Sequence, residues 1–271
     1  MQKGKVRFRR PTADEQSVLS AMSVKLLLRP QDIQKCDQVL IEHHYLHSAQ
    51  LVGEQLRYAV IWKGQWLAVA TWSAAALHLK ARDQFIGWTE EQRRQRLALV
   101  VNNSRLYVLP QCHYPNLVSR FMKLMLARLS ADWESTWGHP VALAESFVDP
   151  QQYRGTAYKV SGWSQLGLTM GWKRSAVDFY EKHGHPKQVW VRELVKKACV
   201  KLRAAQLPPP WAEVLSKVPP RCTAKVGEIA SLMELGPRHP RVPAQAVPGL
   251  SDRRHAGAHR HGNLQRRHQR L

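Results

Sequence analysis

Two carboxylates in an apolar stretch are the first candidates for chemistry. Glu145 and Asp149 stand four residues apart within residues 142–150, where a strand would place both on one face. There they could converge on a metal ion or act as a general base beside a cation. Two acids without a third ligand make a weak metal site, so we predict no metal. Asp149 also fits the N-cap of a helix opening at Pro150, which leaves Glu145 as the better catalytic candidate.

Amide and guanidinium groups gather in a second cluster, at the expected junction between a helix and a strand. Asn102, Asn103 and Arg105 could grip a phosphate or a carboxylate, since a guanidinium binds such anions bidentately. In the structural alternative, the asparagines end a helix in left-handed conformation and Arg105 pairs with a surface acid. The residues alone leave both interpretations open.

A third segment places an Arg-Gly-Thr sequence beside tyrosines. Arg154, Thr156 and Lys159 could contact a phosphate, and Gly155 would let a ligand approach the backbone closely. The alternative is a helix that packs through Tyr158. The sequence contains neither a Gly-x-x-x-x-Gly-Lys-Ser/Thr phosphate loop nor a dinucleotide-binding fingerprint, which disfavours ATP hydrolysis and NAD chemistry by those routes.

A pair of adjacent histidines closes an amphipathic helix near residue 44. His43 and His44 point to different sides of such a helix, so they cannot both ligate one metal comfortably. We expect one of them in the core and the other in solvent. The sequence assigns no cofactor.

These residues require a scaffold in which strands and helices alternate. Hydrophobic periodicity predicts strands over residues 24–28, 56–62, 66–72, 104–109, 141–148, 163–172 and 188–194. Helices are expected over residues 30–46, 89–100 and 116–129, the last being the longest, and again after Asp149, near 195–206 and near 224–235. The runs 56–62 and 66–72 should form a hairpin. This order predicts an α/β domain around one mixed sheet flanked by helices.

Positive charge dominates the 271-residue chain, with 41 Lys and Arg against 20 Asp and Glu and a formal net charge of +21. Cations that neutralise phosphates release counterions, so nucleic acid, and DNA in particular, is the expected partner. A hydrophobic content of 44% with ten Trp suffices for a core. The sequence shows no membrane span or signal peptide, so we expect a cytoplasmic protein without a membrane partner. The four cysteines are too widely spaced for a zinc ribbon or a disulfide framework.

Composition divides the chain into four parts. They are a basic N-terminal arm (1–22), the α/β domain (23–202), a helical connector (203–236) and a disordered basic tail (237–271). The tail holds eight Arg and five His but no aromatic residue, so it cannot build a core.

Seven ordered blocks resemble the DruA family, named for the Druantia anti-phage defence system and similar to domains at the front of some transposases. The blocks are His44-Tyr45-Leu46, Gly53 with Leu56-Arg57-Tyr58, Arg82-Asp83 with Ile86-Gly87-Trp88, residues 102–110, Asp132-Trp133, residues 145–149, and residues 155–171. The resemblance spans about residues 24–194. It implies a cleft lined by Asn103, Arg105, Glu145, Asp149 and Thr156, with Asn102, Arg154, Lys159, His44 and Arg57 as further nucleic-acid contacts.

The order of elements is also similar to that of the acyl-CoA N-acyltransferases, the GNAT fold. Residues 158–163 look like a late Tyr-x-x-x-Gly-aromatic segment of those enzymes. By this analogy Glu145 would act as a base and Tyr158 as an acid. The glycine-containing loop that binds the coenzyme pyrophosphate has no counterpart, because residues 111–119 contain no glycine.

Three functions follow from these resemblances. The first is a DNA-binding DruA-like protein of an anti-phage system or mobile element, with unassigned chemistry and with other defence or transposition proteins as partners. The second is a GNAT-fold, acyltransferase-like enzyme. The third is a truncated or frameshifted transposase N-terminal domain without activity. Whether the chain is an enzyme is left undecided by the sequence.

Overall fold

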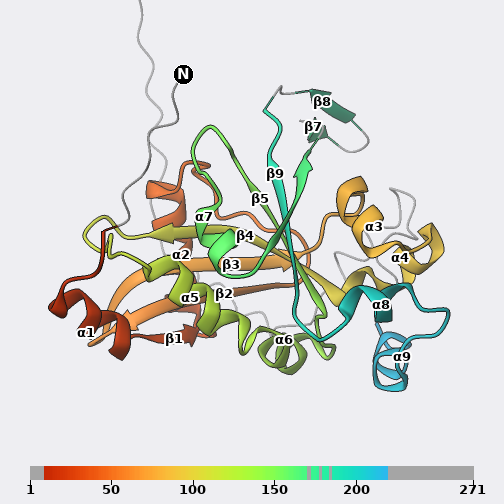
Figure 1. Ribbon diagram of the computed structural model, residues 1–271, viewed down its shortest axis with the longest axis horizontal. Coiled ribbons are helices and arrows are strands. Elements are labelled where there is room, and N and C mark those ends of the chain that lie inside the picture. Colours follow the sequence, from red (N-terminus) through yellow and green to blue (C-terminus); the bar gives the residue numbers. More distant parts are fainter. Residues whose placement is uncertain (1–8, 170–171, 177–178, 183–184, 219–271) are drawn as a thin grey trace, which may run out of the picture. The chain divides into compact units, whose positions relative to one another are not determined.

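A seven-stranded mixed sheet carries the fold (Figure 1). The computed structural model describes residues 9–169, 172–176, 179–182 and 185–218. The strands lie in the order β1-β2-β3-β4-β5-β9-β6. Neighbouring strands are antiparallel except β4 and β5, which run parallel. The predicted mixed sheet with flanking helices is therefore confirmed.

The bounds of the elements are as follows. The strands are β1 Ser23–Leu26, β2 Gln55–Trp62, β3 Gln65–Ala74, β4 Val100–Val108, β5 Leu143–Val148, β6 Ser164–Leu168, β7 Trp172–Ala176, β8 Phe179–Lys182 and β9 Gln188–Glu193. The helices are α1 Ala13–Ala21, α2 Pro30–His43, α3 Lys80–Ile86, α4 Glu90–Arg96, α5 Leu117–Leu126, α6 Leu129–Trp137, α7 Thr156–Val160, α8 Ala198–Arg203 and α9 Pro209–Leu215, with a short 3-10 helix at Leu97–Leu99. Strands β7 and β8 pair with each other in a separate ladder.

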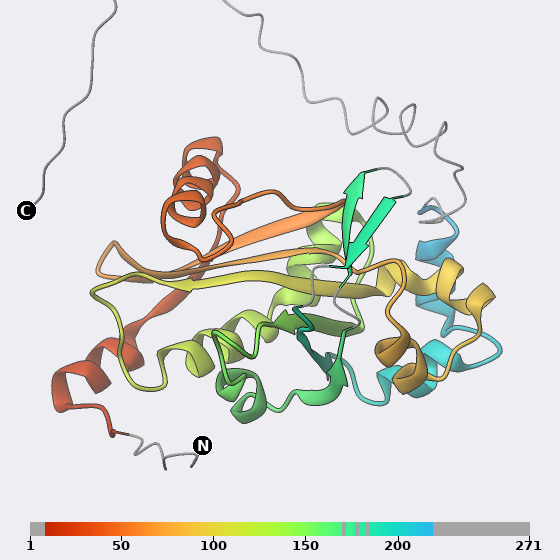
Figure 2. The same ribbon diagram turned by 90° about the horizontal axis from the view of Figure 1, so that it is seen from above.

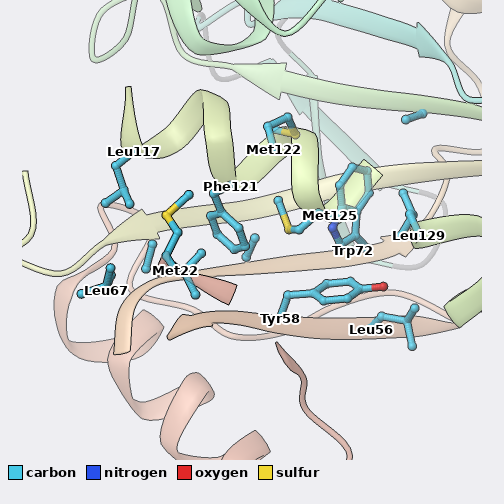
Figure 3. Close-up of a cluster of buried hydrophobic side chains, with 14 of the residues drawn as sticks. Met22, Leu56, Tyr58, Leu67, Trp72, Leu117, Phe121, Met122, Met125 and Leu129 are labelled. Atoms are coloured by element: carbon cyan, nitrogen blue, oxygen red, sulfur yellow. The ribbon is translucent and has the colours of Figure 1, made fainter. Parts of the chain in front are cut away.

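Helices cover both faces of the sheet (Figure 2). On one face α2 packs through Cys36 and Leu40 onto β2 and β3. On the other face α5 buries Phe121 and Met125 against the same two strands (Figure 3). Trp133 of α6 belongs to the same hydrophobic cluster. Burying large apolar and aromatic side chains on both faces is the main stabilising term of such a layered fold.

The predicted hairpin is confirmed, and its turn explains its register. Trp62 pairs with Gln65, so Lys63 and Gly64 form a two-residue loop. Both have positive φ, 47° and 78°, as a type I′ turn requires. The backbone twist of this turn matches the right-handed twist of the strands, so β2 and β3 lie side by side as hydrogen-bonded neighbours.

The long helix predicted over residues 116–129 is wrong in its length. The structure contains two helices, α5 and α6, that meet at Ala127 and Arg128, and α2 is the longest of the described helices. Arg128 leaves helical geometry at φ −121° and pairs with Asp132 while donating to the carbonyl of Val24. This break turns Leu129 and α6 towards the core, where a continuous helix would have carried them past it.

Two further boundaries differ from the predictions for local reasons. Strand β4 begins at Val100, because the valines at 100 and 101 pair with β5, so the asparagine cluster lies inside a strand and not at a helix end. No helix opens at Pro150: Asp149 accepts the Gln151 N–H within a turn, and α7 begins at Thr156.

The N-terminal range assigned to a basic arm contains a helix. Thr12 caps α1 with a complete capping box to Glu15, and Val18 and Leu19 enter the core. This helix is therefore part of the folded body. Residues 1–8, the helix expected near 224–235 and the tail 237–271 lie outside the described residues.

Candidate functional site

A cavity opens where β4 and β5 part. The two strands pair in parallel over Val100–Asn103 and Leu143–Ser146, and beyond this point they diverge. The space between them is a cavity of about 410 Å³. We call it the β4–β5 cavity. Its lining comes from β4, from β5 and the turn after it, from the start of α7, from His44 and Tyr45 after α2, and from His113 and Val118 before and on α5.

Three polar side chains form a fixed hydrogen-bonded wall of the β4–β5 cavity. Asn103 donates from Nδ2 to the carbonyl of Thr71 at 3.1 Å, which leaves its Oδ1 to accept the Tyr158 hydroxyl at 2.6 Å. The Ser146 hydroxyl lies 3.0 Å from the Tyr158 oxygen and can donate to it. Burial raises the pKa of Tyr158 to about 12, so this phenol stays protonated and neutral at physiological pH.

An arginine without an acidic partner faces the same space. Arg105 is half-buried and donates from Nε to the carbonyl of Ser48 at 3.1 Å and from Nη1 to the carbonyl of Ser104 at 2.8 Å. In the part of the chain that the structure describes, no carboxylate pairs with it and its Nη2 makes no hydrogen bond. Burial lowers its pKa, and guanidinium remains charged at any physiological pH.

Lys187, just before β9, adds a second positive charge near Arg105. It is half-buried, and its pKa is lowered first by burial and then by the charge of Arg105, while Asp149 raises it. Lys187 makes no ion pair within the described ranges. Two cations are therefore held close together with Asp149 as the nearby countercharge, and an added anion would relieve their repulsion.

His44 lies beside these cations and is 4% exposed. Its Nδ1 accepts the Leu46 N–H at 3.2 Å, so the neutral ring carries its proton on Nε2. Burial, followed by the charges of Arg105 and Lys187, lowers the pKa of His44 to about 4. Its neighbour His43 is exposed, which confirms that the two histidines face the core and the solvent respectively.

This histidine should make stability depend on pH. Its pKa in the folded protein lies below its value in the unfolded chain, so below about pH 6.5 the unfolded chain binds a proton that the folded protein does not. Stability should fall by about 2 kcal/mol between pH 7 and pH 5 on account of His44 alone. The measurement is urea unfolding at both pH values for the wild type and His44→Gln. An equal pH dependence in the two proteins would refute the assignment.

The structure gathers seven of the predicted site residues around the cavity. They are His44, Asn103, Arg105, Asp149, Arg154, Thr156 and Tyr158. Four others lie elsewhere. Arg57 is held by Asp37 at 2.6 Å, Asn102 donates to the Ser104 hydroxyl, Lys159 is exposed on α7, and Glu145 is buried in an ion pair.

Glu145 belongs to a buried ion pair outside the cavity lining. Its carboxylate accepts Arg82 Nη1 at 2.9 Å and the Ala76 N–H at 2.7 Å, and both charged side chains are 0% exposed. Because side chains alternate along β5, Ser146 and Glu145 point to opposite faces. Burial raises the pKa of Glu145 in spite of the Arg82 charge. The structure therefore does not bring Glu145 to Tyr158.

Comparison with known proteins decides the family. The family model described as Druantia protein DruA matches residues 3–193. The chain belongs to the DruA family. Membership associates it with the Druantia anti-phage defence system, and every residue of the β4–β5 cavity lies within the matched range. A search of curated proteins gives no match.

Solved structures with a similar fold include several acetyltransferases, one of them described as a member of the GNAT family. Aminoglycoside acetyltransferase AAC(6')-Ib with coenzyme A is 14% identical, with 68% of this chain and 100% of that chain covered at a TM-score of 0.42. A GNAT-family protein from Desulfovibrio desulfuricans is 12% identical, with coverage of 65% and 100% and a TM-score of 0.39. The polyamine N-acetyltransferase of Drosophila melanogaster is 14% identical, with coverage of 64% and 99% and a TM-score of 0.39.

Four contributors to the site in this DruA-family chain were missed by sequence reasoning. Ser146, Tyr45 and Tyr153 line the cavity, and Lys187 stands beside Arg105. Strand alternation next to Glu145 was a usable signal for Ser146. Lys187 offered none, since its proximity to Arg105 arises from the insertion of β9 between β5 and β6.

The described residues also limit other kinds of site. No cluster of three or more His, Cys, Asp or Glu side chains among them could hold a metal ion. Cys36, Cys112 and Cys199 are buried free thiols. None of the helices in the described ranges is both long and apolar enough to cross a membrane.

Proposed function

We propose that this DruA-family protein binds nucleic acid, DNA in particular, and that the β4–β5 cavity receives one nucleotide of a single-stranded segment. The observation that carries the proposal is Arg105, a half-buried guanidinium that lines the cavity without a carboxylate partner. Keeping such a cation partly out of water costs free energy that a phosphate would recover through charge-assisted hydrogen bonds.

The rest of the lining suits a nucleotide. Tyr153 is 52% exposed at the cavity, and its ring meets that of Tyr45 edge to face at 5.7 Å. Exposed aromatic faces of this kind stack on nucleobases without regard to sequence. The wall of Asn103, Ser146 and Tyr158 offers polar groups for the edge of a base. A volume of about 410 Å³ is that of a small-molecule site.

The acyltransferase alternative assigned Glu145 as a base and Tyr158 as an acid, and in this geometry Glu145 is not available for that role. That mechanism would require a base near Tyr158, and Glu145 is neutralised by Arg82 outside the cavity lining. We therefore rest the proposal on anion recognition, with Tyr158 as a neutral hydrogen-bonding group and not as an acid in a transfer reaction.

Replacing Arg105 tests the proposal. We expect Arg105→Ala to weaken the binding of a single-stranded oligonucleotide by about 10-fold, because one charge-assisted phosphate contact is lost. Arg105→Lys should retain part of the affinity. The measurement is fluorescence anisotropy with the full chain at two salt concentrations, so that residues outside the described ranges contribute equally to every variant.

The matched control is Arg94→Ala, which removes an exposed arginine that pairs with Glu91 on α4. It should change the affinity less than 2-fold. The thermal midpoint of each variant shows whether it is folded. Equal affinities for Arg105→Ala and Arg94→Ala would refute the cavity as a phosphate site. If the wild-type protein itself binds no DNA, the result favours the third hypothesis, a transposase N-terminal domain without activity.

A further inference from the structure

A second basic hollow lies beside α7. It has a volume of about 640 Å³ and is lined by α5, by the residues that follow α7, and by the end of β9. We call it the α5–α7 groove. Its charged lining residues are Arg120 and Lys123 on α5, and Arg192 and Glu193 on β9. Neither the hydrogen-bonded wall nor Arg105 takes part in it.

The three cations of the α5–α7 groove have no acidic partner among the described residues. Arg120 donates from Nη1 to the carbonyl of Leu19 at 3.2 Å, and Arg192 donates from Nη1 to the carbonyl of Ser161. Glu193 is directed to α8, where one carboxylate oxygen accepts the Cys199 N–H at 2.9 Å. The groove therefore keeps a surplus of positive charge.

The backbone below Arg192 is shaped to receive this side chain. Gly162 has φ +76°, and a Cβ at this position would overlap Arg192 Nη1. The missing Cβ thus leaves room for the guanidinium at the C-terminal end of α7, where it reaches the carbonyl of Ser161. Beside it, the Ser161 hydroxyl is buried and has no hydrogen-bond partner in the described structure, so its donor is not committed to another group of the protein.

Helix α7 joins the groove to the cavity. Its first residues line the β4–β5 cavity, and Val160, Ser161 and Gly162 line the α5–α7 groove. At a rise of 1.5 Å per residue, about 6 Å of helix separates Thr156 in the cavity from Val160 in the groove. Lys159, exposed on the same short helix, adds one more unpaired cation between them. Helix α7 contacts α5 (Figure 1).

We propose that the α5–α7 groove binds the phosphodiester backbone of the strand whose nucleotide enters the β4–β5 cavity. This inference rests on the proposed function, because the occupant is the same nucleic acid. A polymer with one charge per nucleotide can contact cations in both places at once, and each phosphate neutralised releases counterions. A single small anion would occupy one of the two hollows and leave the other cations uncompensated.

The test compares short and long ligands. The probes are a 5′-phosphorylated dinucleotide, which can fill the cavity alone, and a single-stranded 20-mer, which can fill both regions. The variant Arg120→Ala/Lys123→Ala, in the full chain, should weaken 20-mer binding by about 10-fold at low salt. It should also reduce the slope of log Kd against log salt by about 1.4, at roughly 0.7 per phosphate for a single strand. Dinucleotide binding should be unchanged.

A control variant with the same loss of charge makes the outcomes separable. Arg94→Ala/Lys217→Ala removes two exposed cations that pair with Glu91 and Glu213 elsewhere on the surface. If the groove variant binds the 20-mer as this control does while Arg105→Ala still weakens both probes, the groove is overturned and the proposed function stands. If the groove variant acts as expected but Arg105→Ala has no effect, the cavity assignment fails alone. If no variant differs from the control, both fail.

Discussion

Replacing Arg82 by alanine is expected to lower the free energy of unfolding by about 3–5 kcal/mol. The reason is the carboxylate that would be left behind. Arg82 and Glu145 are both 0% exposed, and their 2.9 Å contact joins α3 to β5. Without the guanidinium, Glu145 must either keep a buried charge or take up a proton, and both cost free energy. Urea unfolding of the wild type and Arg82→Ala measures the loss.

A double replacement separates the loss of a partner from the loss of packing. In Arg82→Met/Glu145→Leu no charge remains buried, so this variant should recover much of the stability that Arg82→Ala loses. Asp83, which also accepts from Arg82, is partly exposed and can be solvated. If Arg82→Ala lowers the free energy of unfolding by less than about 1 kcal/mol, the ion pair contributes little to stability and Glu145 does not depend on Arg82 as its partner.

Gly155→Ala is expected to cost about 2–4 kcal/mol, for two additive reasons. Gly155 has φ +69°, which an L side chain adopts only with strain. Its Cβ would also come within 2.5 Å of Trp190 Cζ2, and the ring is packed in the core and cannot move freely. Since Gly155 lines the β4–β5 cavity, the displaced ring should also weaken the proposed DNA binding.

The comparison variant for this prediction is Gly138→Ala. Gly138 has nearly the same backbone angle, φ +77°, but nothing lies within 4 Å of a Cβ built on it. It should lose only the backbone part, about 1–2 kcal/mol. Chemical unfolding of the two variants gives the difference that belongs to Trp190. Equal losses would mean that the tryptophan adjusts without cost.

Local signals were sufficient for several elements of the fold. Two apolar runs separated by residues 63–65 predicted a hairpin, and the structure contains it with a type I′ turn at Lys63 and Gly64. A helix was predicted to begin at residue 89, and Thr89 and Gln92 form the capping box of α4. In each case the stabilising interaction joins residues within three positions of each other. The local sequence alone therefore suffices to predict the turn or the cap.

The predictions of helix boundaries failed where one local sequence pattern is compatible with two structures. Asp149 before Pro150 is typical of a helix start, yet the same carboxylate can close a turn, and here it accepts the Gln151 N–H. The apolar series from Leu117 to Leu129 fits one helix, but Arg128 interacts with Val24, more than 100 positions away. Only the tertiary contact decides between the two.

In the candidate site, too, some features could be predicted from the local sequence and others depend on tertiary contacts. Arg105 and Tyr158 could be singled out by residue type in an unusual setting. Their surroundings could not, because Asn103 meets Ser146 only through the parallel register of β4 and β5. The prediction that Glu145 and Asp149 share a strand face does not hold, because β5 ends at Val148 and Asp149, in the turn that follows, borders the cavity while Glu145 does not. Which side of β5 would border a cavity could not be predicted. That depends on where the strands part, and the divergence has no signature in β4 or β5 alone.

The place of β9 in the sheet has a consequence for the order in which the protein can form on the ribosome. β5 and β6 are separated by β9, which is made after both of them. Until residues 188–193 have left the exit tunnel, β5 and β6 each present an unpaired edge, and Trp190 and Lys187 are missing from the cavity region. Closure is therefore a late event in synthesis, and the growing chain must keep two open strand edges from pairing elsewhere until β9, the last of the described strands, has emerged.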